Sequence, residues 1–204
     1  MTTPTMIAGA SDAAIADWIA QRLGVALTKG PAVVALPGGA TPFPILRELV
    51  QRPLDWPRVT CVPTDDRLVA EDHPASNIGK LRALLEPAGA CVRALAPDIT
   101  VPHLALCWLG MGTDGHVASL FPNTDPQGCD PQSVRRLTPD PLPPEAPFDR
   151  ITLTIPALID ADEVLFVARG EEKAALFLQA ARRANDLPVA RLLAAAQCPV
   201  TCFT

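Results

Sequence analysis

The chain has 204 residues, of which 49% are apolar, and its 17 basic and 22 acidic side chains give a formal net charge of -5. This length suits a single domain, residues 1–204, and the apolar content excludes a disordered chain. A nucleic-acid-binding protein would show a basic surplus or stripe, which is absent. No apolar run approaches the roughly 18 residues of a membrane span.

Six cysteines are spread through the chain, most of them inside apolar, strand-like runs. Buried free thiols of this kind are typical of a reducing cytosol, and the N-terminus lacks the pattern of a secretory signal. Cys198 and Cys202 lie four residues apart, but no other Cys or His pair completes a zinc set. We therefore predict a cytoplasmic protein and interpret these two residues as core thiols.

Helical and strand-like segments alternate along the chain. Ser11 is predicted to cap a helix that ends at Lys29, Thr41 to cap a helix with Pro42 at its first position, and Asn77 to cap a third. The predicted helices cover residues 12–29, 42 onward, 77–85 and 171–184. The predicted strands are residues 32–36, 58–62, 91–95, 104–109, 150–154, 163–168 and 199–203.

This alternation predicts an α/β fold of the Rossmann-like type, a mostly parallel sheet with helices on both faces. Residues 63–76 are predicted to be a polar loop, and the proline-rich residues 122–149 a long irregular excursion across the surface. Ligands of such sheets bind beyond the carboxyl ends of the strands. Four polar or glycine-rich segments follow predicted strands there.

The first segment is a glycine turn, Gly38 and Gly39, followed by the helix that opens at Thr41. Glycines let the backbone approach a ligand, and the free N–H groups of a helix start suit a phosphate. A plain tight turn before a helix explains the same pattern, so both interpretations stay open.

The second segment, Asp65 to Arg67, could orient a base and clamp an anion. It could equally be a salt bridge on a solvated loop.

The third segment places His116 in a glycine-rich turn directly after the strand 104–109. Histidine titrates near neutral pH and is the most frequent general base of enzymes. We therefore predict that His116 is catalytic, whereas Asp114 is open to interpretation as a turn residue. In the fourth segment Lys173 falls in the first turn of a helix, where the helix dipole disfavours a cation. A bound anion would explain that position, as would solvation.

In their order along the chain, these segments resemble the 6-phosphogluconolactonase family. The matching stretches are residues 37–42 (PGGATP), 64–67 (TDDR) with 72–74 (DHP) and 76–77 (SN), 109–122 (LGMGTDGHVASLFP), 151–158 (ITLTIPAL) and 170–174 (GEEKA). The resemblance implies a sugar-phosphate isomerase type of fold. It also implies hydrolysis of 6-phospho-D-glucono-1,5-lactone to 6-phospho-D-gluconate in the oxidative pentose phosphate pathway, without a metal or organic cofactor.

The resemblance also implies roles for individual residues. His116 would deprotonate the attacking water, Asp65 would orient the water or the histidine, and Arg67 would face the oxyanion or the phosphate. The implied phosphate ligands are Gly38, Gly39, Thr41 and Lys173. Two departures from the family stand out: Asp66 replaces a glutamate, and the segment between Gly79 and Leu104 is shorter than the family's.

Two other functions fit parts of the pattern. A glucosamine-6-phosphate deaminase-like isomerase shares the fold and a related Asp-Gly-His stretch, but Ile-Ala-Phe-Asn tends to follow its histidine and Arg67 has no counterpart there. A non-catalytic sugar-phosphate sensor would normally carry a DNA-binding helix-turn-helix, and only about ten residues precede the first predicted helix. The sequence leaves the oligomeric state open.

Overall fold

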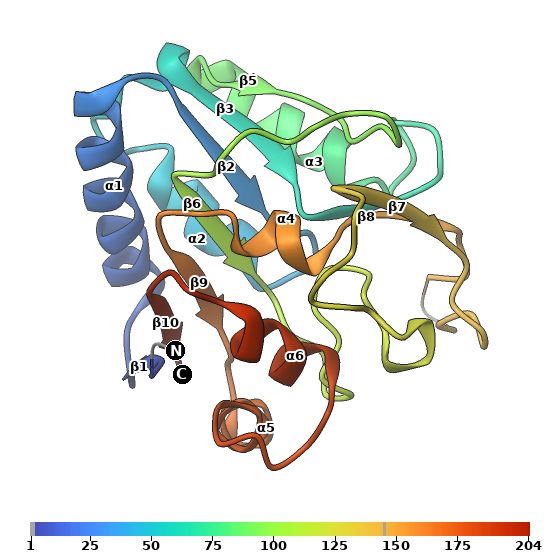
Figure 1. Ribbon diagram of the computed structural model, residues 1–204. Helices are drawn as coiled ribbons and strands as arrows, with labels where there is room; N and C mark the ends of the chain where they lie inside the picture. The colour runs from blue at the N-terminus through green and yellow to red at the C-terminus, as the bar shows by residue number, and fades with distance from the viewer. Residues whose placement is uncertain (1–2, 145) are drawn as a thin grey trace.

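The computed structural model describes residues 3–144 and 146–204. The central sheet of these residues has seven parallel strands in the order β1-β10-β9-β6-β2-β3-β5, which confirms the predicted mostly parallel α/β fold (Figure 1). These strands are β1 (Thr5–Ile7), β2 (Ala32–Leu36), β3 (Val59–Pro63), β5 (Cys91–Val92), β6 (Leu106–Leu109), β9 (Val164–Val167) and β10 (Val200–Phe203).

Helices cover both faces of this sheet. They are α1 (Asp12–Lys29), α2 (Pro42–Leu49), α3 (Asn77–Leu85), α4 (Ile155–Ile159), α5 (Glu171–Ala181) and α6 (Pro188–Ala195). One apolar cluster joins the sheet to α1, α2 and α3, and a second joins it to α4, α5 and α6. Successive strand residues serve opposite clusters, as Cys107 and Trp108 of β6 do, because side chains alternate across a strand.

A second, smaller sheet is antiparallel and has the order β4-β8-β7. It consists of β4 (Asp65–Arg67), β7 (Val134–Leu137) and β8 (Arg150–Leu153). Only β8 was predicted: β4 lies in the predicted polar loop, and β7 lies in the predicted irregular excursion. Both predictions were wrong at these residues, because strands of three or four residues with charged side chains carry no detectable apolar alternation.

The starts of the helices confirm part of the predicted capping. Ser11 caps α1, and its side chain accepts a hydrogen bond from Ala14 N at 3.2 Å. Pro42 opens α2 as predicted, but Thr41 already has helical backbone angles and makes no side-chain cap. The cap of α3 is Ser76 rather than Asn77, since Ser76 Oγ accepts from Gly79 N at 3.1 Å.

The connection from β5 to β6, residues 93–105, contains neither a helix nor a strand. It still closes part of the core, because Leu95, Val101 and Leu104 are buried. The short helices α4 and α6 and the edge strand β1 were not predicted, and α5 ends at Ala181 instead of residue 184. No helix in the described ranges combines the length and the apolar character that crossing a bilayer requires.

Candidate active site

A cleft of about 370 Å³ opens where β2, β3, β6 and β9 end. The turns after these strands bring together all seven of the predicted site residues in its wall: Gly38, Gly39, Thr41, Asp65, Arg67, His116 and Lys173. Other residues that line the cleft are Asn77, Trp108, Met111, Gly112, Ala118 and Val167. None of residues 122–144 or 146–149 is part of this wall.

His116 stands at the cleft with one ring nitrogen engaged and one free. Its Nδ1 lies 2.6 Å from Asp114 Oδ1, and its backbone N–H donates to the same oxygen at 3.2 Å. Nε2 has no hydrogen-bond partner among the described residues, and the side chain is 33% exposed. A proton on Nδ1, shared with Asp114, leaves Nε2 as an acceptor. Asp114 is thus more than a turn residue, because it orients the ring.

Glycine at position 112 makes room for this pair. A Cβ there would lie 2.2 Å from His116 Nδ1 and 2.5 Å from Asp114 Oδ1, well inside contact distance. The turn is closed by Gly112 N, which donates to His116 O at 3.0 Å. Helix α6 supports its other side, since Val189 N donates to Gly115 O at 3.1 Å.

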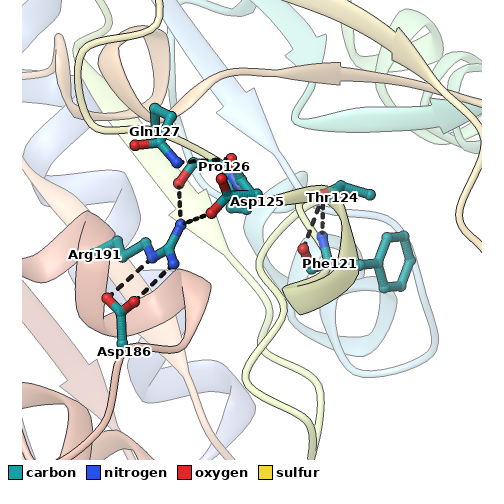
Figure 2. A network of polar contacts seen from close by, with 7 residues as sticks. All are labelled: Phe121, Thr124, Asp125, Pro126, Gln127, Asp186 and Arg191. Atoms are coloured by element: carbon teal, nitrogen blue, oxygen red, sulfur yellow. Dashed lines mark hydrogen bonds and ion pairs between the residues drawn. The ribbon is translucent and has the colours of Figure 1, made fainter.

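The ring of Phe121 packs against His116 with 4.7 Å between the ring centroids. Figure 2 shows the polar contacts of Phe121 and of the residues that follow it. Thr124 Oγ1 accepts from Phe121 N at 3.1 Å and donates to Phe121 O at 2.8 Å. Arg191 of α6 forms an ion pair with Asp125 next to this turn. Helix α6 therefore also holds the residue that follows the Phe121–Thr124 turn.

Asp65 is buried in the wall of the cleft, with only 9% of its surface exposed. Ser119 Oγ donates to its Oδ2 at 2.5 Å, and Thr64 Oγ1 donates to its Oδ1 at 3.3 Å. Burial raises the pKa of Asp65, while the hydrogen bond from Ser119 and the nearby charge of Arg67 act against that rise. Asp65 makes no hydrogen bond to His116; Asp114 makes it instead.

The guanidinium of Arg67 is held by a backbone carbonyl and an amide oxygen rather than by a carboxylate. Its Nη1 donates to Ala75 O at 2.9 Å and to Asn77 Oδ1 at 3.2 Å. Asn77 Nδ2 in turn donates to Asp65 O at 2.8 Å. A Cβ on Gly38 would lie 2.1 Å from Asn77 Oδ1, so only glycine fits there. Asn77 lay within a matching stretch, but its bonds to Arg67 and Asp65 had no signal in the sequence.

Asp66, which stands where the family has glutamate, is fully engaged despite its shorter side chain. Its Oδ1 accepts from Arg67 N at 2.8 Å and from Asn77 N at 2.6 Å, and its Oδ2 accepts from Ile78 N at 2.9 Å. The carboxylate therefore satisfies free N–H groups at the start of α3, where a negative charge is favoured. The shorter aspartate therefore still supports both Arg67 and the start of α3.

Another part of the cleft wall is suited to an anion. The glycine turn before α2 lies there, with Gly39 at φ +93°. Lys173 comes from the first turn of α5 and has no carboxylate within 4 Å among residues 3–144 and 146–204. The nearby Arg169 is directed elsewhere and pairs with Asp12 at 2.7 Å. Lys173 and the backbone of the glycine turn thus line the same cleft, and neither Lys173 nor the turn is paired with an acid among the described residues.

The sequence profile of the family described as glucosamine-6-phosphate isomerases/6-phosphogluconolactonase matches residues 8–92 and 86–201. The two matched segments meet at residues 86–92, inside the segment that is predicted to be short. A 6-phosphogluconolactonase of Pseudomonas putida is 38% identical over 196 aligned residues, which cover 86% of this chain and 80% of the relative.

Solved structures share the fold over almost the whole chain. A 6-phosphogluconolactonase from Shewanella baltica has a TM-score of 0.82 at 25% identity, covering 98% of this chain and 97% of that one. A monomeric glucosamine-6-phosphate deaminase has a TM-score of 0.74 at 16% identity, covering 98% of this chain and 96% of that one. The second likeness concerns the fold alone.

Proposed function

The chain belongs to the glucosamine-6-phosphate isomerase/6-phosphogluconolactonase family, and on this premise we propose that it hydrolyses 6-phospho-D-glucono-1,5-lactone to 6-phospho-D-gluconate. This is a step of the oxidative pentose phosphate pathway. The observation that carries the proposal is that one cleft is lined by both His116 and Lys173, and that neither His116 Nε2 nor the Lys173 ammonium has a partner among the described residues. A base for water and an anchor for phosphate are what the reaction requires.

His116 acts as the general base. Nε2 takes a proton from a water molecule while the water oxygen forms a bond to the lactone carbonyl carbon. Asp114, at 2.6 Å from Nδ1, stabilises the imidazolium that results. The carbonyl then re-forms, the bond from this carbon to the ring oxygen breaks, and His116 returns the proton to the departing oxygen. The products are a hydroxyl group and a carboxylic acid on an open chain, and the acid releases its proton to the solvent to become the carboxylate.

The remaining residues bind the substrate and stabilise charge. Gly38, Gly39, Thr41 and Lys173 hold the phosphate, which does not react but orients the lactone toward the base. Arg67 is the second cation of the cleft and serves the oxyanion, the phosphate or both. Asp65 contributes a negative charge near His116 and an acceptor for substrate hydroxyls. Both sheets supply residues to this one cleft, in line with a single functional domain.

We place the reaction in the cytoplasm. All six cysteines are free thiols, and burial raises the pKa of Cys61 to about 12, which keeps that thiol protonated. Cys198 Sγ contacts Ile159 O at 3.6 Å and Cys202 Sγ contacts Phe203 O at 3.8 Å. A reducing compartment preserves such thiols.

The proposal is tested by following acid release from freshly prepared 6-phospho-D-glucono-1,5-lactone, with spontaneous hydrolysis subtracted. The purified protein should accelerate the reaction in proportion to its concentration. Ammonia release from glucosamine 6-phosphate serves as the comparison and should stay at background. Hydrolysis no faster than background would refute the proposal, and ammonia release would indicate the isomerase-like alternative. Binding of 6-phospho-D-gluconate without turnover would indicate a sensor.

Replacing Lys173 with glutamine should raise KM for the phosphorylated lactone about 10-fold or more and change kcat little. The reason is the loss of one charge-assisted contact to a phosphate that does not react. Steady-state kinetics on D-glucono-1,5-lactone, which lacks the phosphate, provide the internal comparison, because the two proteins should then perform alike. Lys29→Gln, at the end of α1, is the matched control. An unchanged KM in Lys173→Gln would remove this residue from the phosphate site.

A further inference from the structure

A buried polar triangle lies beneath the cleft and connects the histidine turn to the antiparallel sheet. Ser119, 1% exposed, donates from Oγ to Asp65 Oδ2 at 2.5 Å and from its backbone N–H to Thr152 Oγ1 at 3.2 Å. Asp65 and Thr152 face each other in the pairing of β4 with β8. Three chain segments far apart in the sequence therefore meet through one serine.

Asp65 depends on this serine because no cation contacts its carboxylate. Among the described residues its carboxylate has no ion pair within 4 Å, and the two groups that donate hydrogen bonds to it are hydroxyls, those of Thr64 and Ser119. The charged or titratable groups around it are Asp66 and Arg67 on its own strand, Arg150 on β8 and His116.

Both of the nearby arginines are occupied elsewhere. Arg67 donates to Ala75 O and Asn77 Oδ1, and Arg150 donates to the carbonyls of Phe148 and Ala146. Of the two hydroxyl contacts to Asp65, the one from Ser119 is shorter by 0.8 Å (2.5 against 3.3 Å). It is the stronger of the two, since hydrogen bonds to a carboxylate weaken with length.

The same serine also fixes the turn that carries the base. Ala118, which lines the cleft between His116 and Ser119, has φ +51°, a backbone conformation that alanine adopts only when its surroundings enforce it. The two hydrogen bonds of Ser119 come directly after it. Ser119 therefore couples the position of the His116 turn to the ionisation state of Asp65.

We propose that Ser119 is a positioning residue of the reaction, and that its hydroxyl keeps Asp65 ionised and directed at the cleft beside His116. An ionised Asp65 stabilises the imidazolium that His116 becomes when it takes the proton of water. Ser119 itself touches neither water nor lactone. The catalytic part of this inference rests on the proposed function, and the interaction between Ser119 and Asp65 does not.

The expected pH dependence follows from the direction of the pKa shift. Burial raises the pKa of Asp65, and the Ser119 hydroxyl limits that rise. In Ser119→Ala the pKa rises further, so Asp65 becomes protonated at a higher pH. The acid limb of the kcat/KM profile should then move to higher pH, and kcat/KM at neutral pH should fall about 10-fold or more.

A double-mutant cycle separates this role from a general structural one. Ser119→Ala should cost about 10-fold in kcat/KM in the wild type, but less than about 2-fold in an Asp65→Asn background. Thr152→Val is the matched control: it removes the acceptor of the Ser119 backbone N–H and leaves the hydroxyl on Asp65. That variant should lose stability without moving the acid limb. Additive losses in the cycle, or a shifted limb in Thr152→Val, would overturn the proposal.

A second readout needs no enzyme activity. Because the folded-state pKa of Asp65 is raised, its ionisation costs stability as the pH rises through that pKa, and more so without Ser119. The Tm of Ser119→Ala should therefore fall further below wild type at pH 8 than at pH 5. If the difference in Tm between wild type and Ser119→Ala does not change with pH, the inference is wrong. If this Tm difference grows with pH but neither protein hydrolyses the lactone, the proposed function is wrong, whereas the interaction between Ser119 and Asp65 is confirmed.

Discussion

Replacing His116 with glutamine is expected to lower kcat for lactone hydrolysis by about 10²- to 10⁴-fold, the contribution typical of a positioned general base. Glutamine keeps a polar group of similar size but cannot take the proton of water. The side chain is 33% exposed and contacts Asp114 and Phe121 at the mouth of the cleft, so the fold should survive. Initial rates at saturating lactone, together with the Tm of each protein, measure both effects.

The other carboxylate-paired histidine gives the control for this experiment. His103 Nδ1 lies 2.6 Å from Asp160 and its Nε2 lies 3.2 Å from Asp162, on the surface and outside the cleft. These partners raise the pKa of His103. His103→Gln removes a histidine–aspartate pair of the same kind and should leave kcat unchanged. Full activity in His116→Gln, or equal losses in the two variants, would contradict the assignment of the base.

Substituting Gly112 with alanine should lower kcat about 100-fold with a much smaller loss of stability. The added Cβ would lie 2.2 Å from His116 Nδ1 and 2.3 Å from its Cε1, so the ring must leave its place beside Asp114. Side chains at an open cleft can move aside without disturbing the core. The loss falls on catalysis, because small misplacements of a reacting group can cost about 10² in rate. Steady-state kinetics and thermal unfolding of the same preparation distinguish the loss of kcat from the loss of stability.

Gly24→Ala is the matched glycine substitution. Gly24 lies inside α1, and nothing is within 4 Å of the position that its Cβ would take. Alanine there should stabilise the protein by roughly 0.5–1 kcal/mol and leave the kinetics unchanged. Should Gly112→Ala instead unfold the protein, or keep wild-type kcat, the steric argument for this glycine would be wrong.

The sequence could predict which segments form the site, because their positions follow from the ends of the parallel strands. Parallel strands direct their carboxyl ends to one edge of the sheet, so the polar segments after residues 36, 63, 109 and 167 had to lie near one another. The structure places all seven predicted residues in one cleft for this reason. The resemblance to a family supplied their chemical roles, which remain proposals.

Sequence reasoning could not find the contacts that arise only from tertiary packing. Ser119 and Asp65 are 54 residues apart, and no local pattern connects them. Asn77 was predicted to cap its helix, yet its side chain binds Arg67 and the Asp65 backbone instead. Strand β4 is too short for any periodicity and forms because β8 offers a partner. In each case a distant partner, rather than local preference, determines the structure.

The pairing of β1 with β10 has a consequence for the order of folding. Strand β1 lies at the edge of the sheet and pairs with β10, almost two hundred residues along the chain, with Thr5 opposite Thr201. Strand β10 itself pairs with the much nearer β9, with Val200 opposite Val164. Contacts of such sequence separation bear the entropy of closing a long loop before they stabilise anything. Strands β2, β3 and β6 have nearer partners and can assemble earlier. We therefore expect the docking of β1 onto β10 to be the last step of folding and the first contact of the sheet to open.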